Sequence, residues 1–138
     1  MSEAAGQPAR PSRPALPEPA FHAGIIAAVA LGYILVRVVL APATGPLRWH
    51  ATDLLAGTAL PSLFALLFPA ATELGRWSRT IAGKLVLTAS AVMVWEVAVP
   101  LFSDRSTADL MDVAAYLAGT LVQHGFVRLV APGTGPAA

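Results

Sequence analysis

The sequence contains no cysteine and few charged residues. The absence of cysteine excludes disulfide bonds, thiolate metal sites and cysteine nucleophiles. Charged residues make up 12% of the 138 residues, which is about half the share in an ordinary soluble domain, and hydrophobic residues make up 56%. This composition predicts an integral membrane protein.

Basic residues are scarce and scattered. Nine Lys and Arg stand against eight Asp and Glu, and the net charge is +1. No basic run is long enough to follow a phosphate backbone, so we expect no nucleic acid partner. Gly83-Lys84 lacks the earlier glycine and the following Ser or Thr of a phosphate-binding loop. We predict no cofactor.

Apolar runs and prolines divide the chain into three parts. Residues 1–20 hold five of the twelve prolines and are predicted to form a disordered Pro/Ala-rich tail. Residues 21–131 are predicted to form a four-span transmembrane domain, and residues 132–138 a flexible C-terminal tail. The predicted fold is an all-α integral membrane four-helix bundle, because each apolar run can cross a hydrocarbon core of about 30 Å. The spans are expected at 21–41, 53–74, 81–102 and 106–130.

Two details of the spans bear on packing. The first apolar run contains Arg37 and is longer than the apolar region of a removable signal peptide, so we interpret it as a retained span. Gly24, Ala28 and Gly32 recur in it every four residues, which favours close packing against another helix. Pro61 lies inside the second span, where a neighbouring helix is expected to satisfy the carbonyl that proline leaves free.

Basic residues are distributed unequally between the two sides of a four-span arrangement. The side with both termini and the 75–84 loop has six, and the opposite side has three. The positive-inside rule therefore predicts that both termini are cytoplasmic. The six are Arg10, Arg13, Arg76, Arg79, Lys84 and Arg128, and the three are Arg37, Arg48 and Arg105.

Antiparallel packing of the spans brings a set of ionisable residues to one level near the outer surface. Glu96 lies near the end of the third span, and Asp109 and Asp112 open the fourth on the same helix face as Tyr116. A charge at mid-bilayer costs about 2.5–3.5 kcal/mol, so we expect these groups to be paired or protonated. The predicted cluster comprises Glu96, Arg105, Asp109, Asp112, Arg37, Asp53 and Arg48, with His50 at the same level.

The residues alone leave four roles open for this cluster. Ion pairs of Arg37 and Arg105 with the carboxylates would hold helix ends together. The arginines would alternatively bind an anionic lipid headgroup or a phosphorylated envelope intermediate. A carboxylate pair such as Glu96 and Asp112 would suit general acid/base catalysis. With Asp109, the same two carboxylates would suit a hard cation. We assign no catalytic residue and no metal ligand.

The run from Glu96 to Asp112 reads E-x8-R-x3-D-x2-D and leads into AAYLAG. This pattern resembles the VanZ-like family of small bacterial membrane proteins, or a neighbouring group of four-span proteins with the same Glu/Arg/Asp pattern. In that family a Glu near the end of the third span precedes an Arg and an Asp pair at the start of the fourth. The resemblance implies a four-span fold in the bacterial inner (cytoplasmic) membrane, without implying a reaction.

We therefore expect a multi-pass protein of the cell envelope that is a binding or accessory protein more readily than an enzyme. Its expected partners are membrane lipids, including an anionic lipid or a lipid-linked envelope intermediate held at the cluster. Two alternatives stay open. One is a small accessory subunit of a larger membrane complex, and the other is a membrane enzyme acting on a lipid-linked substrate.

Overall fold

The structure is a computed structural model that describes residues 17–39, 46–98, 102 and 109–130, with the backbone alone at 46–49 and 97–98. The described chain is helical and contains no strand, which confirms the predicted all-α class. The helices are α1 (Glu18–Val39), α2 (Pro46–Leu67), α3 (Glu73–Ser78), α4 (Ile81–Met93) and α5 (Leu110–Val130), and α4 continues into a wider π-helical turn, η1 (Val94–Ala98).

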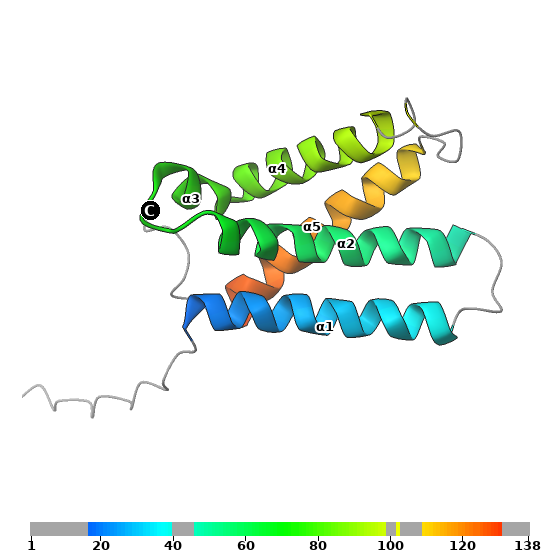
Figure 1. The fold of residues 1–138 in the computed structure, drawn as a ribbon, viewed down its shortest axis with the longest axis horizontal. Coiled ribbons are helices and arrows are strands. Elements are labelled where there is room, and N and C mark those ends of the chain that lie inside the picture. The colour runs from blue at the N-terminus through cyan, green and yellow to red at the C-terminus, as the bar shows by residue number, and fades with distance from the viewer. Residues whose placement is uncertain (1–16, 40–45, 99–101, 103–108, 131–138) are drawn as a thin grey trace, which may run out of the picture.

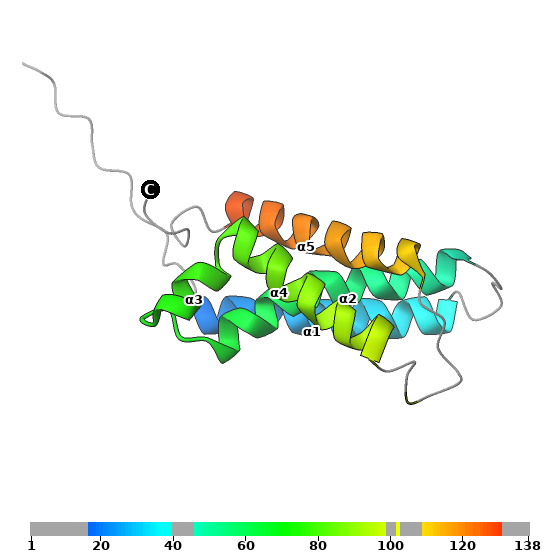
Figure 2. The same cartoon turned by 90° about the horizontal axis from the view of Figure 1, so that it is seen from above.

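The long helices form one bundle with two distinct ends. Helices α1 and α2 lie side by side and run antiparallel, and α5 crosses α2 diagonally (Figure 1). Helix α4 packs on α5 and α2, and the short α3 lies at one end of the bundle (Figure 2). We call this end, with the start of α1 and the end of α5, the α3 end. The other end, with the start of α2 and the start of α5, is the η1 end.

Among the described residues, three helices are long and apolar enough to cross a membrane. They lie at Glu18–Val39, His50–Leu67 and Leu110–Val130. The 13 residues of α4 and the 5 of η1 run on as one helical segment, about 27 Å long at 1.5 Å per residue. This segment is close to the thickness of a bilayer core, so its length suits a fourth span.

The second predicted span has different boundaries. Helix α2 begins at Pro46, which suits a first helical position because an N–H there would have no intrahelical partner. It ends at Leu67, so Asp53 lies inside the helix instead of opening it. The separate helix α3 was not predicted, because six residues are too few to show a helical period.

Glycines set the close crossing of α2 and α5. A Cβ on Gly57 would overlap the backbone at Tyr116, and one on Gly119 would overlap the backbone of α2. Pro61 has no N–H, so the Gly57 carbonyl loses its usual helical partner. The Thr120 hydroxyl of α5 lies 3.2 Å from that carbonyl oxygen, and it is also within hydrogen-bond distance of the Thr88 hydroxyl and the Tyr116 carbonyl. A neighbouring helix thus places a donor beside the carbonyl freed by Pro61.

The interior of the bundle is more polar than its surface. Large apolar side chains point outward, with Leu129 84% exposed and Val38 68% exposed. Soluble proteins show the opposite arrangement, whereas lipid can surround an apolar surface. Among the described residues the buried hydrophobic ones are Ile25, Ala65 and Val92, and the buried polar ones are His22, Ser62, Ser78, Lys84, Thr88, Glu96, Thr120 and Gln123.

Candidate functional site

Four acidic side chains and one histidine from α2, η1 and α5 meet at the η1 end. The His50 Nδ1 atom lies 2.9 Å from Asp112 Oδ1. The Asp112 carboxyl also lies close to that of Asp53. Glu96 is only 8% exposed and accepts a hydrogen bond from the backbone N–H of Asp109. We call these five residues, His50, Asp53, Glu96, Asp109 and Asp112, the carboxylate cluster.

Local structure explains how the cluster is assembled. Asp109 immediately precedes α5, and its carboxylate accepts a 2.9 Å hydrogen bond from the Met111 N–H, as an N-cap residue does. Asp112 lies in the first turn of α5, where the helix dipole favours a negative charge. Glu96 lies in η1, and π-helical turns are frequent at functional sites. The local sequence therefore places Asp109, Asp112 and Glu96 at the η1 end of the bundle.

Asp53 of α2 and Asp112 of α5 bring two carboxyl groups close together. Two such groups hydrogen-bond to each other only when one of them carries a proton. The Tyr116 hydroxyl, one turn further along α5 than Asp112, lies near the Asp53 carboxyl.

Of the three arginines predicted to belong to the cluster, the structure describes the side chain of Arg37. The Arg37 Nε donates a 3.0 Å hydrogen bond to the Tyr33 hydroxyl on its own helix, and its guanidinium carbon lies 5.3 Å from the centre of that ring. Arg48 lies in the first turn of α2, where only the backbone is described, and Arg105 lies outside the described residues. In the described part of the chain, the cluster contains one pair within ion-pair distance, His50 with Asp112.

The cluster offers two kinds of chemistry. The imidazole of His50 and the carboxylates of Asp109 and Asp112 present atoms that all lie within 4.8 Å of one another, close enough to share a divalent cation. Glu96 is buried and Asp109 is exposed, so the cluster also contains carboxyl groups in different environments, as general acid/base catalysis requires. The carboxylate side chains of the cluster accept hydrogen bonds.

An apolar cavity of about 340 Å³ opens beside the cluster. Its walls come from α1, α2, α4 with η1, and α5, and they include Leu60, Ala91, Trp95 and Tyr116. Binding sites for small molecules usually have volumes of about 300–1,000 Å³. Tyr116 therefore belongs both to an apolar cavity and, through its hydroxyl, to the carboxylate cluster.

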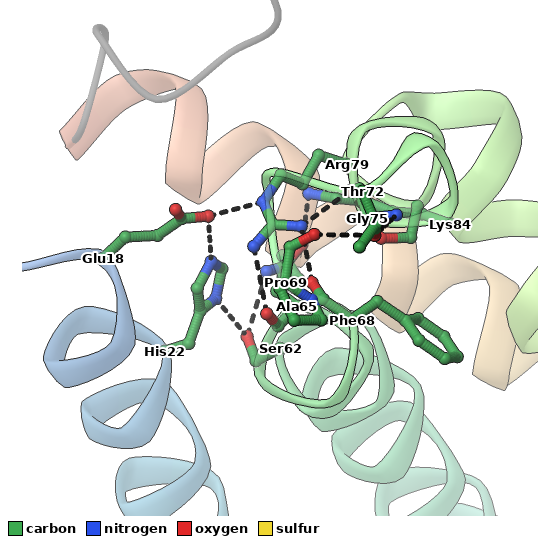
Figure 3. A network of polar contacts seen from close by, with 12 residues as sticks. Glu18, His22, Ser62, Ala65, Phe68, Pro69, Thr72, Gly75, Arg79 and Lys84 are labelled. Atoms are coloured by element: carbon green, nitrogen blue, oxygen red, sulfur yellow. Dashed lines mark hydrogen bonds and ion pairs between the residues drawn. The ribbon is translucent and has the colours of Figure 1, made fainter.

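A second polar group crosses the bundle near the α3 end, and we call it the buried polar chain (Figure 3). The Lys84 Nζ donates to Gln123 Oε1 at 2.9 Å. The Gln123 Nε2 donates to Ser62 Oγ at 3.0 Å, which leaves the Ser62 hydroxyl free to donate to His22 Nδ1 at 3.2 Å. The His22 Nε2 lies 3.7 Å from Glu18 Oε1. The donors can thus all point from Lys84 toward Glu18, an arrangement in which successive hydrogen bonds strengthen one another.

Arg79 anchors the far end of the buried polar chain. Its Nε donates to Glu18 Oε1 at 2.6 Å. Its terminal nitrogens donate to the carbonyl oxygens of Ala65, Phe68 and Gly75 at 3.0, 3.0 and 2.6 Å (Figure 3). One side chain therefore joins the start of α1, the end of α2 and α3.

The sequence patterns indicated a polar cluster at the η1 end, and the buried polar chain was not predicted from them. Its signal was present, because Ser62 and Gln123 are isolated polar residues inside apolar runs, where burial in lipid is costly. Each residue could be identified as unusual from the sequence. Their partners could not, because they lie on other helices, 39 to 61 residues away in the sequence.

Replacing Gln123 by leucine tests the buried polar chain. We expect Gln123→Leu to lower the free energy of unfolding by about 1–3 kcal/mol, because Lys84 loses its buried acceptor. Thermal unfolding in mild detergent measures the change. Val122→Leu, at an exposed position of the same helix, is the control and should change stability by less than about 0.5 kcal/mol. Equal stability of the two variants would show that the buried polar chain does not stabilise the fold.

No family model, curated protein or solved structure matches this chain. We therefore infer a function from the contacts within the chain itself.

Proposed function

We propose that this protein binds an amphipathic, lipid-like molecule in the bacterial inner membrane, as a binding or accessory protein of the cell envelope. One observation carries the proposal. Tyr116 lines the apolar cavity, and its hydroxyl lies near Asp53 of the carboxylate cluster. An amphipathic molecule whose apolar part fills this cavity would place its polar group beside the carboxylate cluster.

The proposal includes a four-span topology with both termini in the cytoplasm. The polar interior and the apolar surface of the helical bundle support a lipid environment. Among the described residues, four basic ones, Arg76, Arg79, Lys84 and Arg128, lie toward the α3 end together with Glu18 and Glu73, whereas four acidic ones lie at the η1 end together with Arg37 and Arg48. This distribution favours a cytoplasmic α3 end by the positive-inside rule. The carboxylate cluster then faces the outside of the cell membrane.

The VanZ-like pattern supports the same location. It covers Glu96, Asp109 and Asp112, which are members of the carboxylate cluster. In the VanZ-like arrangement these residues lie at the ends of the third and fourth spans. The pattern therefore favours an envelope ligand that approaches from the outer side.

The composition of the cluster indicates the polar group of the ligand. Its described side chains are mainly carboxyl groups, which accept hydrogen bonds and attract cations. Arg37, one of the arginines expected to hold an anion, is bonded to Tyr33. A headgroup with hydroxyl or amine donors suits the described cluster better than a bare anion does. We therefore propose a lipid-linked envelope intermediate whose headgroup bears such donors.

Native mass spectrometry tests this site directly. The protein would be released from its own membrane in mild detergent, and retained lipids identified. We expect one lipid-like molecule per chain, and we expect Ala91→Phe to displace it by filling the cavity. Tyr116→Phe should retain less of it, because the hydroxyl that links cavity and cluster is absent. Ala118→Phe, at an exposed position on α5, is the control. Identical retention in all four proteins would refute the proposed site.

A second candidate, a small subunit of a membrane complex, is favoured by one feature of α1. Gly24 and Ala28 are exposed, and a Cβ on Gly24 would have no heavy atom within 4 Å. Small residues in such a position allow another helix to approach closely. The same mass spectra decide between the candidates, because a heteromeric mass supports a subunit and a lone chain opposes it.

A further inference from the structure

Lys84 is a buried cation that has no carboxylate partner among the residues the structure describes. Its side chain is in α4, and the residue is 4% exposed. The nearest anionic group of the buried polar chain is Glu18, whose carboxylate is bonded to Arg79. The charges that act on Lys84 are those of Arg128 and Arg79, and both are positive. Burying a charge in this way is costly unless an opposite charge compensates it.

His124 and Arg128 add two more basic groups on α5, where His124 directly follows Gln123, the residue bonded to Lys84. They are one turn apart on α5, so they share a helix face. The His124 Nδ1 is buried and has no hydrogen-bond partner in the described part of the chain. Lys84 and Arg128 are the charged groups that act on His124. Three basic groups therefore lie near one another where α4 meets α5, and in the described part of the chain no carboxylate acts on Lys84 or His124.

We infer that Lys84, His124 and Arg128 form a binding site for a phosphate group at the α3 end. A phosphate oxygen would accept a hydrogen bond from the His124 imidazole, and its negative charge would compensate Lys84 and Arg128. Basic pockets between membrane helices on the cytoplasmic side typically bind anionic lipid headgroups. With the proposed topology, this site faces the cytoplasmic leaflet, so the phosphate belongs to an anionic phospholipid. The site is separate from the cavity at Tyr116.

The positive-inside rule alone does not account for this arrangement. That rule requires basic residues in loops and at helix ends, where water solvates them. Arg76 is such a residue, since it is exposed and bonded only to the carbonyl of Ala71. Lys84 and the His124 Nδ1 are instead buried, and water does not solvate them. A bound phosphate supplies the charge and the acceptor that they lack.

Lipid titration of the purified full chain tests the inference. Dioleoylphosphatidylglycerol and dioleoylphosphatidylcholine would be added separately to the protein in mild detergent, and bound lipid counted by native mass spectrometry. We expect one phosphatidylglycerol per chain and weaker binding of phosphatidylcholine. Arg128→Gln should weaken phosphatidylglycerol binding about fivefold, the usual contribution of one basic residue near an anionic membrane. Arg37→Gln, which removes a charge at the η1 end, should not weaken it.

Two further variants keep the test independent of folding. His124→Phe retains both cations and removes the orphan nitrogen, and it should also weaken phosphatidylglycerol binding. Tyr116→Phe should leave phosphatidylglycerol binding unchanged, which separates this site from the cavity. Inorganic phosphate that raises the melting temperature of the wild type, but not of Arg128→Gln, would support the site with a soluble phosphate compound as its ligand. If Arg128→Gln, His124→Phe and Arg37→Gln bind phosphatidylglycerol and phosphate equally, the inference is wrong.

Discussion

Gly119→Val is expected to destabilise the protein by about 3 kcal/mol, the upper part of the range for overpacked cores. Even a Cβ at this position overlaps the Leu54 carbonyl and the backbone at Gly57 and Thr58. Backbone atoms cannot move aside as a flexible side chain can, so α2 and α5 must separate. The separation also weakens the 3.2 Å hydrogen bond from the Thr58 hydroxyl to the Gly119 carbonyl. Thermal unfolding in mild detergent measures the loss.

Gly125 provides the matched control on the same helix. A Cβ on Gly125 meets nothing within 4 Å, so Gly125→Val adds the same side chain without a clash. We expect Gly125→Val to retain a melting temperature close to that of the wild type. If the two variants lower stability equally, the loss comes from placing valine in a helix. That result would contradict the close crossing of α2 and α5.

Arg79→Gln should cost about 3 kcal/mol or more, because it removes one partner of a largely buried ion pair. The Arg79 side chain is 12% exposed, and that of Glu18 is 30% exposed. The variant leaves the Glu18 carboxylate without its 2.6 Å contact and frees the carbonyls of Ala65 and Phe68. We expect the junction of α1, α2 and α3 to open first, which protease accessibility near α3 and thermal unfolding would report.

Two substitutions sharpen the Arg79 experiment. Arg76→Gln removes the same charge from an exposed position in α3 and should cost less than about 1 kcal/mol. Arg79→Lys keeps the charge but loses the planar set of donors that reaches four acceptors, so it should recover only part of the stability. Full recovery in Arg79→Lys would show that charge alone, and not the carbonyl contacts, holds the junction.

The carboxylate cluster and the proposed phosphate site lie toward opposite ends of the bundle and differ in charge. The carboxylate cluster at the η1 end is acidic, and Lys84, His124 and Arg128 toward the α3 end are basic. The Thr88 and Thr120 hydroxyls, 2.9 Å apart and fully buried, lie along the helices between them. A ligand with donor groups and a phosphate ligand would therefore be sorted to opposite ends of the molecule.

The sequence by itself determined the helical class and much of the carboxylate cluster. Long apolar runs cannot pair their backbone groups with lipid, so they form helices. Asp109 and Asp112 share a turn, and Glu96 ends the preceding helical segment, so their proximity follows from a short connection and helix periodicity. The sequence also identifies the carbonyl that Pro61 leaves free, because proline lacks the N–H that would bond to the carbonyl four residues earlier.

Only the tertiary structure decided which faces of the helices meet. The sequence suggested close packing at Gly24, Ala28 and Gly32, yet the close crossing is at Gly57 and Gly119. It also suggested that Arg37 would reach the carboxylates, and the structure instead joins Arg37 to Tyr33 on the same helix. Helix periodicity defines the residues that share a face, but the rotation and crossing of each helix depend on side chains from all its neighbours. For this reason the buried polar chain, the cavity at Tyr116 and the basic group around Lys84 became visible only in the folded bundle.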